Sequence, residues 1–327
     1  MPTTHSSNPD RPFDSIINFR DVGRTINQMA GKRLLKEGVL FRSARLDEAS
    51  DEDIRHLTGN LNVSTILDLR STTEHRMAIT KYRKTHPAPS PEENPGGQGE
   101  EEYIHLPPLE DTKATRHLIS LTGRAFEMRL LWRLDWWNFT KLLAYLAAGY
   151  RQDAVRIIGE NVMKPAGLTG LAMDTLEAST AELKEVFDLL GSRELPSSPS
   201  PPSPSSSPGA NDSTGGVLVH CTQGKDRTGL VILLLLLLTG VVEGSAIARE
   251  YVRSEKELER VSAEEKEERM REIRALGLGE EYTRCPVDFT EGVTRFLEER
   301  YGGVRGYLRF AGVEDGVIEA VRRRFVA

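Results

Sequence analysis

The chain has 327 residues, with 43 Lys and Arg against 49 Asp and Glu, and a formal net charge of −6. This charge gives no general attraction to nucleic acid or to an anionic membrane, so we expect no nucleic-acid partner. Only two cysteines are present, which argues against a disulfide framework and predicts a reducing compartment, the cytoplasm.

Neither a signal peptide nor a membrane span is expected. Residues 1–12 are polar and include three prolines. The longest apolar run, residues 230–238, ends before Gly240, whereas a membrane helix takes about 20 apolar residues. With 38% hydrophobic residues the chain has enough apolar side chains for one large domain over residues 1–327.

Strand and helix patterns alternate along the first third of the chain. Residues 39–41 and 64–69 predict strands, and between them Ser50 predicts the start of a helix over residues 51–57. A further strand is expected at residues 103–106. This alternation predicts an α/β fold, with a mainly parallel central sheet flanked by helices.

Residues 116–190 turn helical, with Leu and Trp at spacings of three and four. Because this block precedes the last strand, we expect an insertion that packs on the active-site face as a lid. Trp132, Trp136 and Trp137 are its candidate lid residues, although most of its apolar residues should be ordinary helix core.

Two segments are expected to be disordered loops, and one to be a solvated helix pair. Residues 84–102 are rich in Pro, Gly and Glu, and residues 193–215 are rich in Pro and Ser, so neither can bury enough apolar surface to order itself. Residues 243–281 are dense in alternating charges and predict exposed helices with no chemistry of their own.

The most informative segment runs from His220 to Gly229. Residues 216–220 predict a buried strand before it, and residues 228–238 predict a buried helix after it. A tight loop between two such elements directs backbone N–H groups toward one point, where the helix dipole also favours negative charge. We therefore expect an anion-binding loop. The residues predicted to bind the anionic substrate there are Thr222, Gln223, Gly224, Lys225 and Thr228.

Cys221 and Arg227 bracket this loop and predict its chemistry. The helix N-terminus favours the thiolate of Cys221, which would act as a nucleophile. Arg227 can bind two phosphate oxygens at once, and these oxygens gain charge in the transition state. Thr228 is expected to donate its hydroxyl to the sulfur, and His220 to brace the loop rather than to act as a base. A lone Cys after a strand is commonly a buried hydrophobe, but here eight informative positions coincide.

This His-Cys, five residues, Arg-Thr pattern resembles the signature of the cysteine-dependent tyrosine and dual-specificity phosphatase superfamily. The continuation Gly-Lys-Asp-Arg-Thr-Gly is similar to its bacterial and fungal branch, which includes a mycobacterial secreted tyrosine and phosphoinositide phosphatase. Residues 18–23, 40–46, 66–71 and 301–308 resemble further motifs of that branch. The resemblance implies that Arg20 and Arg42 support the loop. Lys225 stands where inositol lipid phosphatases carry lysine, which implies phosphoinositides as further substrates.

Phosphate transfer to Cys221 also needs a general acid for the departing oxygen. Asp68 ends a strand expected beside the catalytic strand and is the first choice. Asp226, inside the loop, is the second. The alternatives are a buried carboxylate that holds Arg70, in the case of Asp68, and an acceptor of backbone N–H groups, in the case of Asp226. Residues 110 and 111, Glu and Asp, are further candidates.

The sequence therefore predicts a phosphomonoester hydrolase that forms a phosphocysteine intermediate and needs no metal or cofactor. Phosphotyrosine proteins are the expected substrates, with dual or phosphoinositide specificity left open. One alternative is a non-catalytic phosphate-binding scaffold module, although such modules tend to lose the residues equivalent to Cys221 and Arg227. A second is a rhodanese-like sulfur transferase, although the Lys-Asp-Arg-Thr-Gly continuation suits phosphate better.

Overall fold

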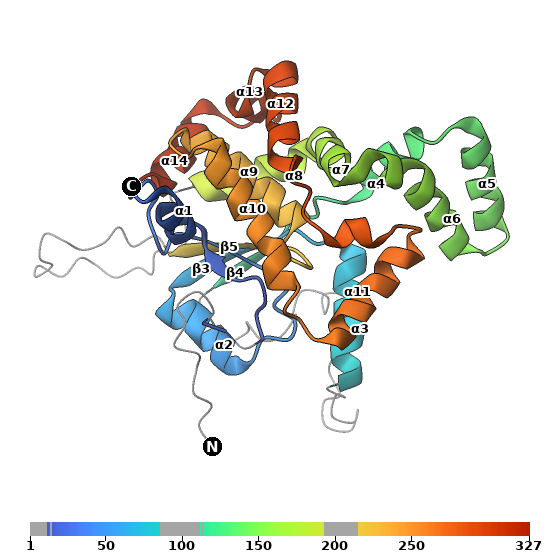
Figure 1. The fold of residues 1–327 in the computed structure, drawn as a ribbon, viewed down its shortest axis with the longest axis horizontal. Helices are drawn as coiled ribbons and strands as arrows, with labels where there is room; N and C mark the ends of the chain where they lie inside the picture. The colour runs from blue at the N-terminus through green and yellow to red at the C-terminus, as the bar shows by residue number, and fades with distance from the viewer. Residues whose placement is uncertain (1–11, 14, 86–111, 113, 193–214) are drawn as a thin grey trace, which may run out of the picture.

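The computed structural model describes residues 12–13, 15–85, 112, 114–192 and 215–327, and places a five-stranded sheet at its centre (Figure 1). The strands are β1 (Arg20–Asp21), β2 (Leu40–Ser43), β3 (Val63–Asp68), β4 (Thr115–Leu118) and β5 (Gly216–His220). Their order is β1-β2-β5-β3-β4, and every neighbouring pair is parallel except the antiparallel β1 and β2. The predicted α/β fold with a mainly parallel sheet flanked by helices is confirmed.

Strand β5 is the central strand and is buried along its whole length. Its side chains alternate as a pleated strand requires, with Val217 and Val219 in the larger core and Leu218 in a smaller core on the other face. The parallel register sets His220 beside both Ser43 and Asp68. Because the carboxyl ends of parallel strands meet at one edge of a sheet, these three strand ends define where a site can form.

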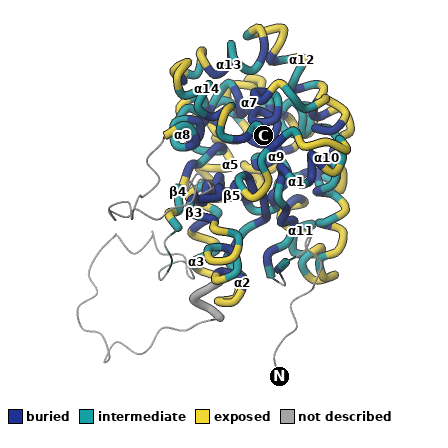
Figure 2. Tube along the Cα trace, turned by 90° about the vertical axis from the view of Figure 1, so that its left-hand side faces the viewer, coloured by how far each residue is buried: buried dark blue, intermediate teal, exposed yellow. Residues whose placement is uncertain are grey.

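Helices cover both faces of the sheet. The larger core is built mainly by α1 (Val22–Ala30), α8 (Thr180–Gly191), α9 (Asp226–Thr239), α10 (Gly244–Leu258), α12 (Phe289–Tyr301), α13 (Val304–Phe310) and α14 (Asp315–Phe325). Figure 2 shows α9 and the strands as the buried interior within an exposed outer layer. The predicted buried helix after the loop is therefore confirmed, and neighbouring helices surround its apolar side chains.

The opposite face is covered by α2 (Asp51–Arg55), which continues as a π-helical turn over His56–Asn60. The predicted start is confirmed, since the Ser50 hydroxyl accepts from the Asp53 N–H and the Asp53 carboxylate accepts from the Ser50 N–H. Helix α3 (Thr72–Thr85) follows β3, so residues 84 and 85, predicted as the start of a loop, are helical. The rest of that loop, the strand predicted at residues 103–106 and nearly all of the loop at 193–215 lie outside the described residues.

The insertion before β5 begins later than its sequence pattern indicates. Residues 115–118 form the edge strand β4, which the helical pattern from residue 116 concealed. The helices that follow are α4 (Arg124–Trp132), α5 (Trp136–Ala147), α6 (Arg151–Ile158), the π-helical turn Gly159–Met163, α7 (Lys164–Ala178) and α8. In the part of the chain that the structure describes, no helix has the length and apolarity needed to cross a bilayer.

Candidate active site

Residues 221–225 join the end of β5 to the first residue of α9, Asp226. Gly224 adopts φ +64°, a left-handed conformation that glycine accepts without strain. A Cβ at this position would lie 2.1 Å from the carbonyl oxygen of Ser43, at the end of β2. Glycine is therefore required both for the turn of the loop and for its close approach to the sheet.

Three polar side chains fasten the loop from the β1 and β2 side. Asn18 Nδ2 donates to the carbonyl oxygens of Gln223 and Gly224 at 2.9 and 3.0 Å. Arg42 Nη2 donates to the same Gly224 oxygen at 2.6 Å. Arg20 holds Asn18 in turn, with 2.5 Å between its Nη1 and Asn18 Oδ1. The carbonyl groups of Gln223 and Gly224 therefore point toward this scaffold.

Glu250 on α10 pairs with both of these buried arginines and balances one of their two positive charges. Its Oε1 lies 2.8 Å from Arg20 Nε and its Oε2 lies 2.6 Å from Arg42 Nη1. Burial raises the pKa of Glu250, but the two guanidinium groups outweigh this effect and lower it. The segment 243–281, predicted as a solvated helix pair without chemistry, therefore supplies a buried carboxylate to the scaffold. Its charge-rich composition gave no signal that Glu250 alone would face inward.

Cys221 is the first residue of the loop and is 2% exposed. His220 precedes it, with its Nδ1 3.2 Å from the Cys221 carbonyl oxygen and its Nε2 3.4 Å from Asp68 Oδ2. Burial lowers the pKa of His220 to about 4, so the ring is neutral at pH 7. The ring thus contacts the loop backbone on one side and a carboxylate on the other, which is the geometry of a brace.

Arg227 meets a carboxylate that the sequence analysis did not identify. Its Nη1 and Nη2 donate to the two oxygens of Glu74 on α3 at 2.6 Å each, and the Thr222 hydroxyl also donates to Glu74. Burial raises the pKa of Glu74, but the hydrogen bonds and charge of Arg227 lower it to about 2. The ionised carboxylate therefore fixes the plane of the guanidinium at the start of α9.

A local signal for Glu74 exists in the sequence. Ser71 and Glu74 have the spacing of a capping box, and the structure shows the Ser71 N–H donating to Glu74 at 2.9 Å. That pattern predicts the start of a helix. It does not predict that the same carboxylate reaches across to Arg227, because the relative position of α3 and α9 depends on the whole sheet.

Asp68 lies behind the loop and is fully buried. It accepts hydrogen bonds from Arg70 Nε at 3.0 Å and from Arg116 Nε at 3.1 Å. Burial raises the pKa of Asp68, but the surrounding positive charge outweighs this and holds it well below its usual range. Since His220 is neutral at pH 7, Arg116 and Arg70 are the cations responsible at that pH. An enclosed, ionised carboxylate has no proton to donate, so the geometry disfavours the acid role predicted first for Asp68.

Asp226 and Lys225 differ in exposure but form an ion pair, with 3.4 Å between Lys225 Nζ and Asp226 Oδ1. The Asp226 side chain is 37% exposed, and its Oδ1 accepts from the Tyr251 hydroxyl at 3.2 Å. Lys225 is fully buried, and its Nζ donates to the carbonyl oxygens of Tyr282 and Arg284 at 2.9 and 2.7 Å. The Lys225 ammonium is therefore engaged inside the protein, which weakens the argument for phosphoinositides that rested on this side chain, while substrate binding by Lys225 remains a prediction for its backbone N–H group.

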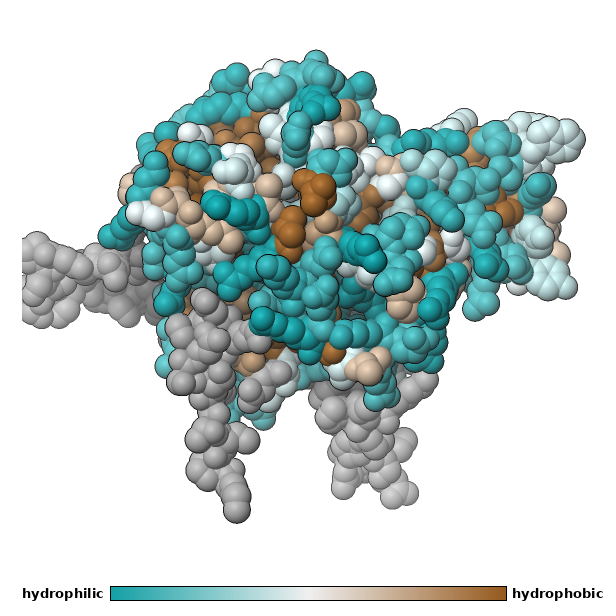
Figure 3. Space-filling view, in the orientation of Figure 1, coloured by the Kyte–Doolittle hydropathy of each residue, from teal (hydrophilic) through white to brown (hydrophobic). Residues whose placement is uncertain are grey.

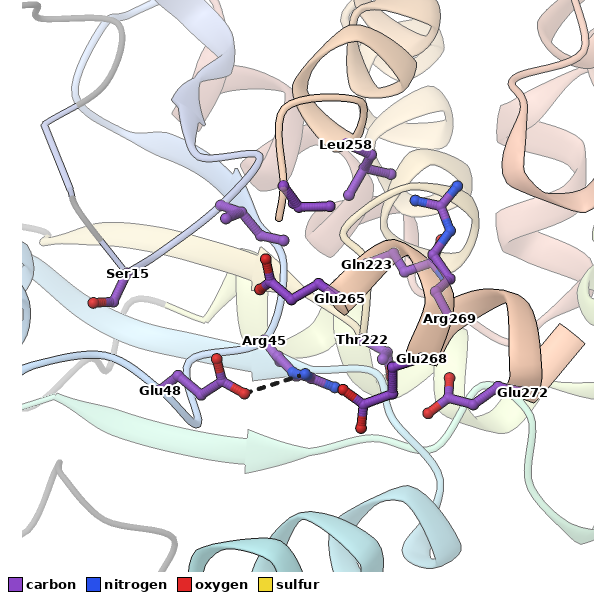
Figure 4. Close-up of a pocket in the computed structure, with 12 residues that line it drawn as sticks. Ser15, Arg45, Glu48, Thr222, Gln223, Leu258, Glu265, Glu268, Arg269 and Glu272 are labelled. Carbon is purple, nitrogen blue, oxygen red and sulfur yellow. Dashed lines mark hydrogen bonds and ion pairs between the residues drawn. The ribbon is translucent and has the colours of Figure 1, made fainter. Parts of the chain in front are cut away.

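Two hollows adjoin the loop. The smaller, about 70 Å³, lies where Thr222 and Gln223 face α11 (Ala263–Ala275), and Figure 4 shows the charged side chains that surround it. These are Arg45, Glu48, Glu265, Glu268, Arg269 and Glu272. The larger, about 360 Å³, has Gln223, Asp226, Arg227 and Glu74 in its wall. Its apolar lining includes Phe126, Met163, Leu168, Leu171, Leu230, Ile273, Leu276, Leu278 and Phe289.

Residues 11–327 match the model of a family described as the tyrosine phosphatase family. The chain belongs to the tyrosine phosphatase family. A tyrosine-protein phosphatase of Nostoc commune is 36% identical over 119 residues, which are 34% of this chain and 39% of that protein. The triple specificity protein phosphatase PtpB of Mycobacterium tuberculosis is 29% identical over 117 residues, 32% of this chain and 42% of that protein. The chain thus aligns with about two fifths of each relative's length, and the predicted resemblance is confirmed.

In this member of the tyrosine phosphatase family, two parts of the chain wall the larger hollow. Phe126 and Leu171, from α4 and α7 of the insertion, share a buried cluster with Ile273 on α11 and with Tyr282 in the 3-10 helix Glu280–Thr283. The insertion therefore does pack beside the active-site face. The lid prediction for the three tryptophans is not supported, because none of them lines either hollow.

The last predicted site residue, Thr228, is fully buried near the start of α9. Its Oγ1 has no hydrogen-bond partner among the residues that the structure describes. The candidate acids at residues 110 and 111 lie outside the described residues. The site thus unites Cys221, Arg227 and Asp226, with Glu74 as an addition.

Proposed function

We propose that the chain is a phosphomonoester hydrolase that acts as a protein tyrosine phosphatase through a phosphocysteine intermediate. The observation that carries this proposal is one loop, at the carboxyl edge of the sheet, that bears a cysteine, a pre-aligned arginine and an accessible carboxylate. Cys221 begins the loop, while Arg227 and Asp226 line the larger hollow beside it. Backbone N–H groups at the start of α9 complete an anion site.

In the first step the Cys221 thiolate attacks phosphorus, and the bond from phosphorus to the leaving oxygen breaks. Asp226 donates the proton that this oxygen takes up, which leaves the phosphocysteine and a carboxylate. Asp226 meets the requirement of access, because it lines the hollow and is partly exposed. Arg227, held in plane by Glu74, stabilises the charge that develops on the phosphate oxygens.

In the second step water attacks phosphorus and gives a proton to the Asp226 carboxylate. The phosphorus–sulfur bond breaks, phosphate forms and the thiolate leaves. The buried Thr228 hydroxyl, which has no other partner among the described residues, would donate to the departing sulfur. The N-terminal end of α9 stabilises that thiolate.

Phosphotyrosine is the proposed substrate because the apolar walls of the larger hollow suit an aryl leaving group. Dual specificity is a secondary proposal, supported by the name of PtpB as a triple specificity phosphatase. Phosphoinositide hydrolysis has the same support but loses the argument from Lys225, whose ammonium is bound to backbone carbonyls.

Hydrolysis of a phosphotyrosine peptide in the presence of a chelator tests the proposal. Wild-type protein should release phosphate. After rapid quenching, the mass of the protein should show one added phosphoryl group, and digestion should place that group on the peptide that contains Cys221. Cys221→Ser should abolish turnover and still bind the phosphopeptide. Binding without turnover by the wild type would favour the scaffold module instead, and turnover by Cys221→Ser would refute the proposed nucleophile.

A further inference from the structure

The end of α4 together with α5 and α6, residues 132–158 (the arm), exposes an unusual number of aromatic side chains. Helix α5 packs chiefly on α6, and the pair projects from the body at the right of Figure 1. Trp132, Trp136 and Trp137, the only tryptophans of the chain, are 83%, 73% and 74% exposed. Other large exposed residues of the arm are Leu143, Tyr145, Leu146, Tyr150 and Val155.

These side chains form a surface and not a core. Of the apolar residues of α5, Leu142 alone is buried, and pale and brown side chains of intermediate and high hydropathy lie on the projecting end in Figure 3. Scattered apolar residues on a surface need no explanation, but a concentration of this kind marks an interaction site.

The charge of the arm is opposite to that of the whole chain. Residues 136–152 include Lys141 and Arg151 and no acidic residue. Both cations are exposed, and neither has an ion-pair partner among the described residues. The arm as a whole has net charge +2, from Arg133, Lys141, Arg151 and Arg156 against Asp135 and Asp153, whereas the chain has −6.

We propose that the arm is a docking surface for an anionic lipid bilayer. Trp and Tyr combine an apolar ring with a polar N–H or O–H group and are enriched at the headgroup level of membranes. Helices that carry aromatic and basic side chains bind in the interface plane, and each basic residue is attracted by the negative surface potential. Because no described helix can span a bilayer, the contact would be peripheral.

A second copy of the chain fits this surface less well. A two-fold dimer brings identical patches together, so the unpaired Lys141 and Arg151 of each arm would face a surface of the same sign. An anionic membrane offers the complementary charge. The net charge of −6 does not oppose this local attraction, because exposed charges are screened beyond about 8–10 Å at physiological salt.

The proposal is independent of the proposed phosphatase activity. None of the arm's exposed aromatic residues lines either hollow beside the loop. Changes at the tip of the arm should therefore alter membrane binding and leave turnover of a dissolved phosphotyrosine peptide as in wild type. A negative result for either activity leaves the other unaffected.

Intrinsic fluorescence provides a direct test, because all tryptophan emission of the chain arises from the arm. Vesicles of phosphatidylcholine with about one third phosphatidylserine should shift the emission to shorter wavelength and pull the protein down on sedimentation. Pure phosphatidylcholine vesicles should do neither, and high salt should reverse the binding.

Two arm variants and one control sharpen the test. Lys141→Gln with Arg151→Gln should weaken binding roughly 30-fold, and Trp136→Gln with Trp137→Gln by at least about tenfold, both measured by sedimentation. Phe310→Gln changes an equally large residue, 63% exposed on α13 outside the arm, and should bind like wild type.

Three results would overturn the proposal. One is an unchanged emission with anionic vesicles. Another is unchanged sedimentation of both arm variants, which would place membrane binding on a different surface. The third is a concentration-dependent blue shift without vesicles, together with a dimer in light scattering, which would make the arm a contact between copies of the chain.

Discussion

Replacing Asp226 by Asn removes the proton that the proposed mechanism gives to the leaving oxygen. General acid catalysis contributes typically ~10²–10⁴-fold, which is about 3–5 kcal/mol of barrier. Asn keeps an oxygen that can accept from the Tyr251 hydroxyl, which lies 3.2 Å from Oδ1 in the present structure. It removes the ion pair with Lys225, but the Lys225 ammonium keeps its two backbone carbonyl acceptors and the Asp226 side chain is partly exposed, so the fold should persist. The full loss should appear with phosphotyrosine, whose phenol has a pKa of about 10. When the leaving group is a strongly acidic phenol, its oxygen needs little protonation, so kcat/KM of the variant for such an aryl phosphate should fall by less than about tenfold.

The matched control is Asp68→Asn, at the carboxylate that the sequence favoured for the same role. Its loss leaves Arg70 and Arg116 without their common partner, although Arg70 keeps its ion pair with Asp47. Breaking a buried ion pair costs about 3–5 kcal/mol. We expect a lower melting temperature and a similar loss for every leaving group. The basic limb of the pH profile of kcat/KM should disappear only in Asp226→Asn.

The assignment is refuted if Asp68→Asn shows the steep dependence on leaving group while Asp226→Asn behaves like wild type. If neither variant shows it, the acid is another residue, and the candidates at positions 110 and 111 become the next to test.

Three further changes test the supports of the loop. The pKa of Glu74, lowered from 4.5 to about 2 in the fold, corresponds to about 3 kcal/mol of stability that is present above pH 4.5 and lost as the pH falls toward 2. The melting temperature of Glu74→Gln should therefore lie well below that of the wild type at pH 7. Calorimetry should show this difference in melting temperature becoming smaller as the pH falls. Gly224→Ala would place a Cβ 2.1 Å from the Ser43 carbonyl oxygen, so kcat/KM should drop more than about tenfold in a protein with a wild-type circular dichroism spectrum. Glu250→Gln leaves two buried guanidinium charges uncompensated and should lower the free energy of unfolding by about 3–5 kcal/mol in urea titration.

Matched exposed residues separate these effects from general sensitivity to mutation. Glu291→Gln removes an exposed ion pair with Arg295 and should change the free energy of unfolding by less than about 1 kcal/mol. Gly244→Ala, a glycine with open space around it, should leave kcat/KM unchanged. If Glu74→Gln has the melting temperature of the wild type at pH 7, or Gly224→Ala has the kcat/KM of the wild type, then these residues do not support the loop in the way proposed.

The parts of the fold that could be predicted are those with local causes. Local residue patterns predict the strand at residues 216–220, the apolar helix after it and the cap at Ser50. Strand β4 was missed because three of the residues 115–118 are polar and none of the four is buried, so the segment shows no alternation at the edge of the sheet. An edge strand with one neighbour leaves little trace in the sequence, and the helical periodicity that begins just after it dominated the interpretation.

The site divides in the same way. The positions of Cys221, Arg227 and Asp226 follow from one contiguous loop, so the motif was sufficient to bring them together. Glu74 contacts Arg227 across 153 positions of sequence, and Glu250 contacts Arg42, which in turn holds the loop, across 208 positions. Only the assembled fold creates these contacts. The geometry argues against the roles predicted for the side chains of Asp68 and Lys225 for a related reason. Sequence gives a residue's charge, but the direction of its side chain depends on the cations or carbonyls that the fold sets beside it.

The charges around the loop also show how a phosphate dianion can be bound selectively. The buried Arg20 and Arg42 share the single carboxylate of Glu250, the Lys225 ammonium donates to two backbone carbonyls and lies 3.4 Å from Asp226 Oδ1, and the terminal nitrogens of Arg227 are held by Glu74. Unpaired cations would be costly to bury and would attract any anion. Here the positive potential for the ligand comes from the charge that these carboxylates do not balance, together with fixed dipoles, namely the loop N–H groups and the first turn of α9. Such donors have a set geometry and need no reorganisation during the reaction, which is the condition under which electrostatic stabilisation of a transition state is most effective.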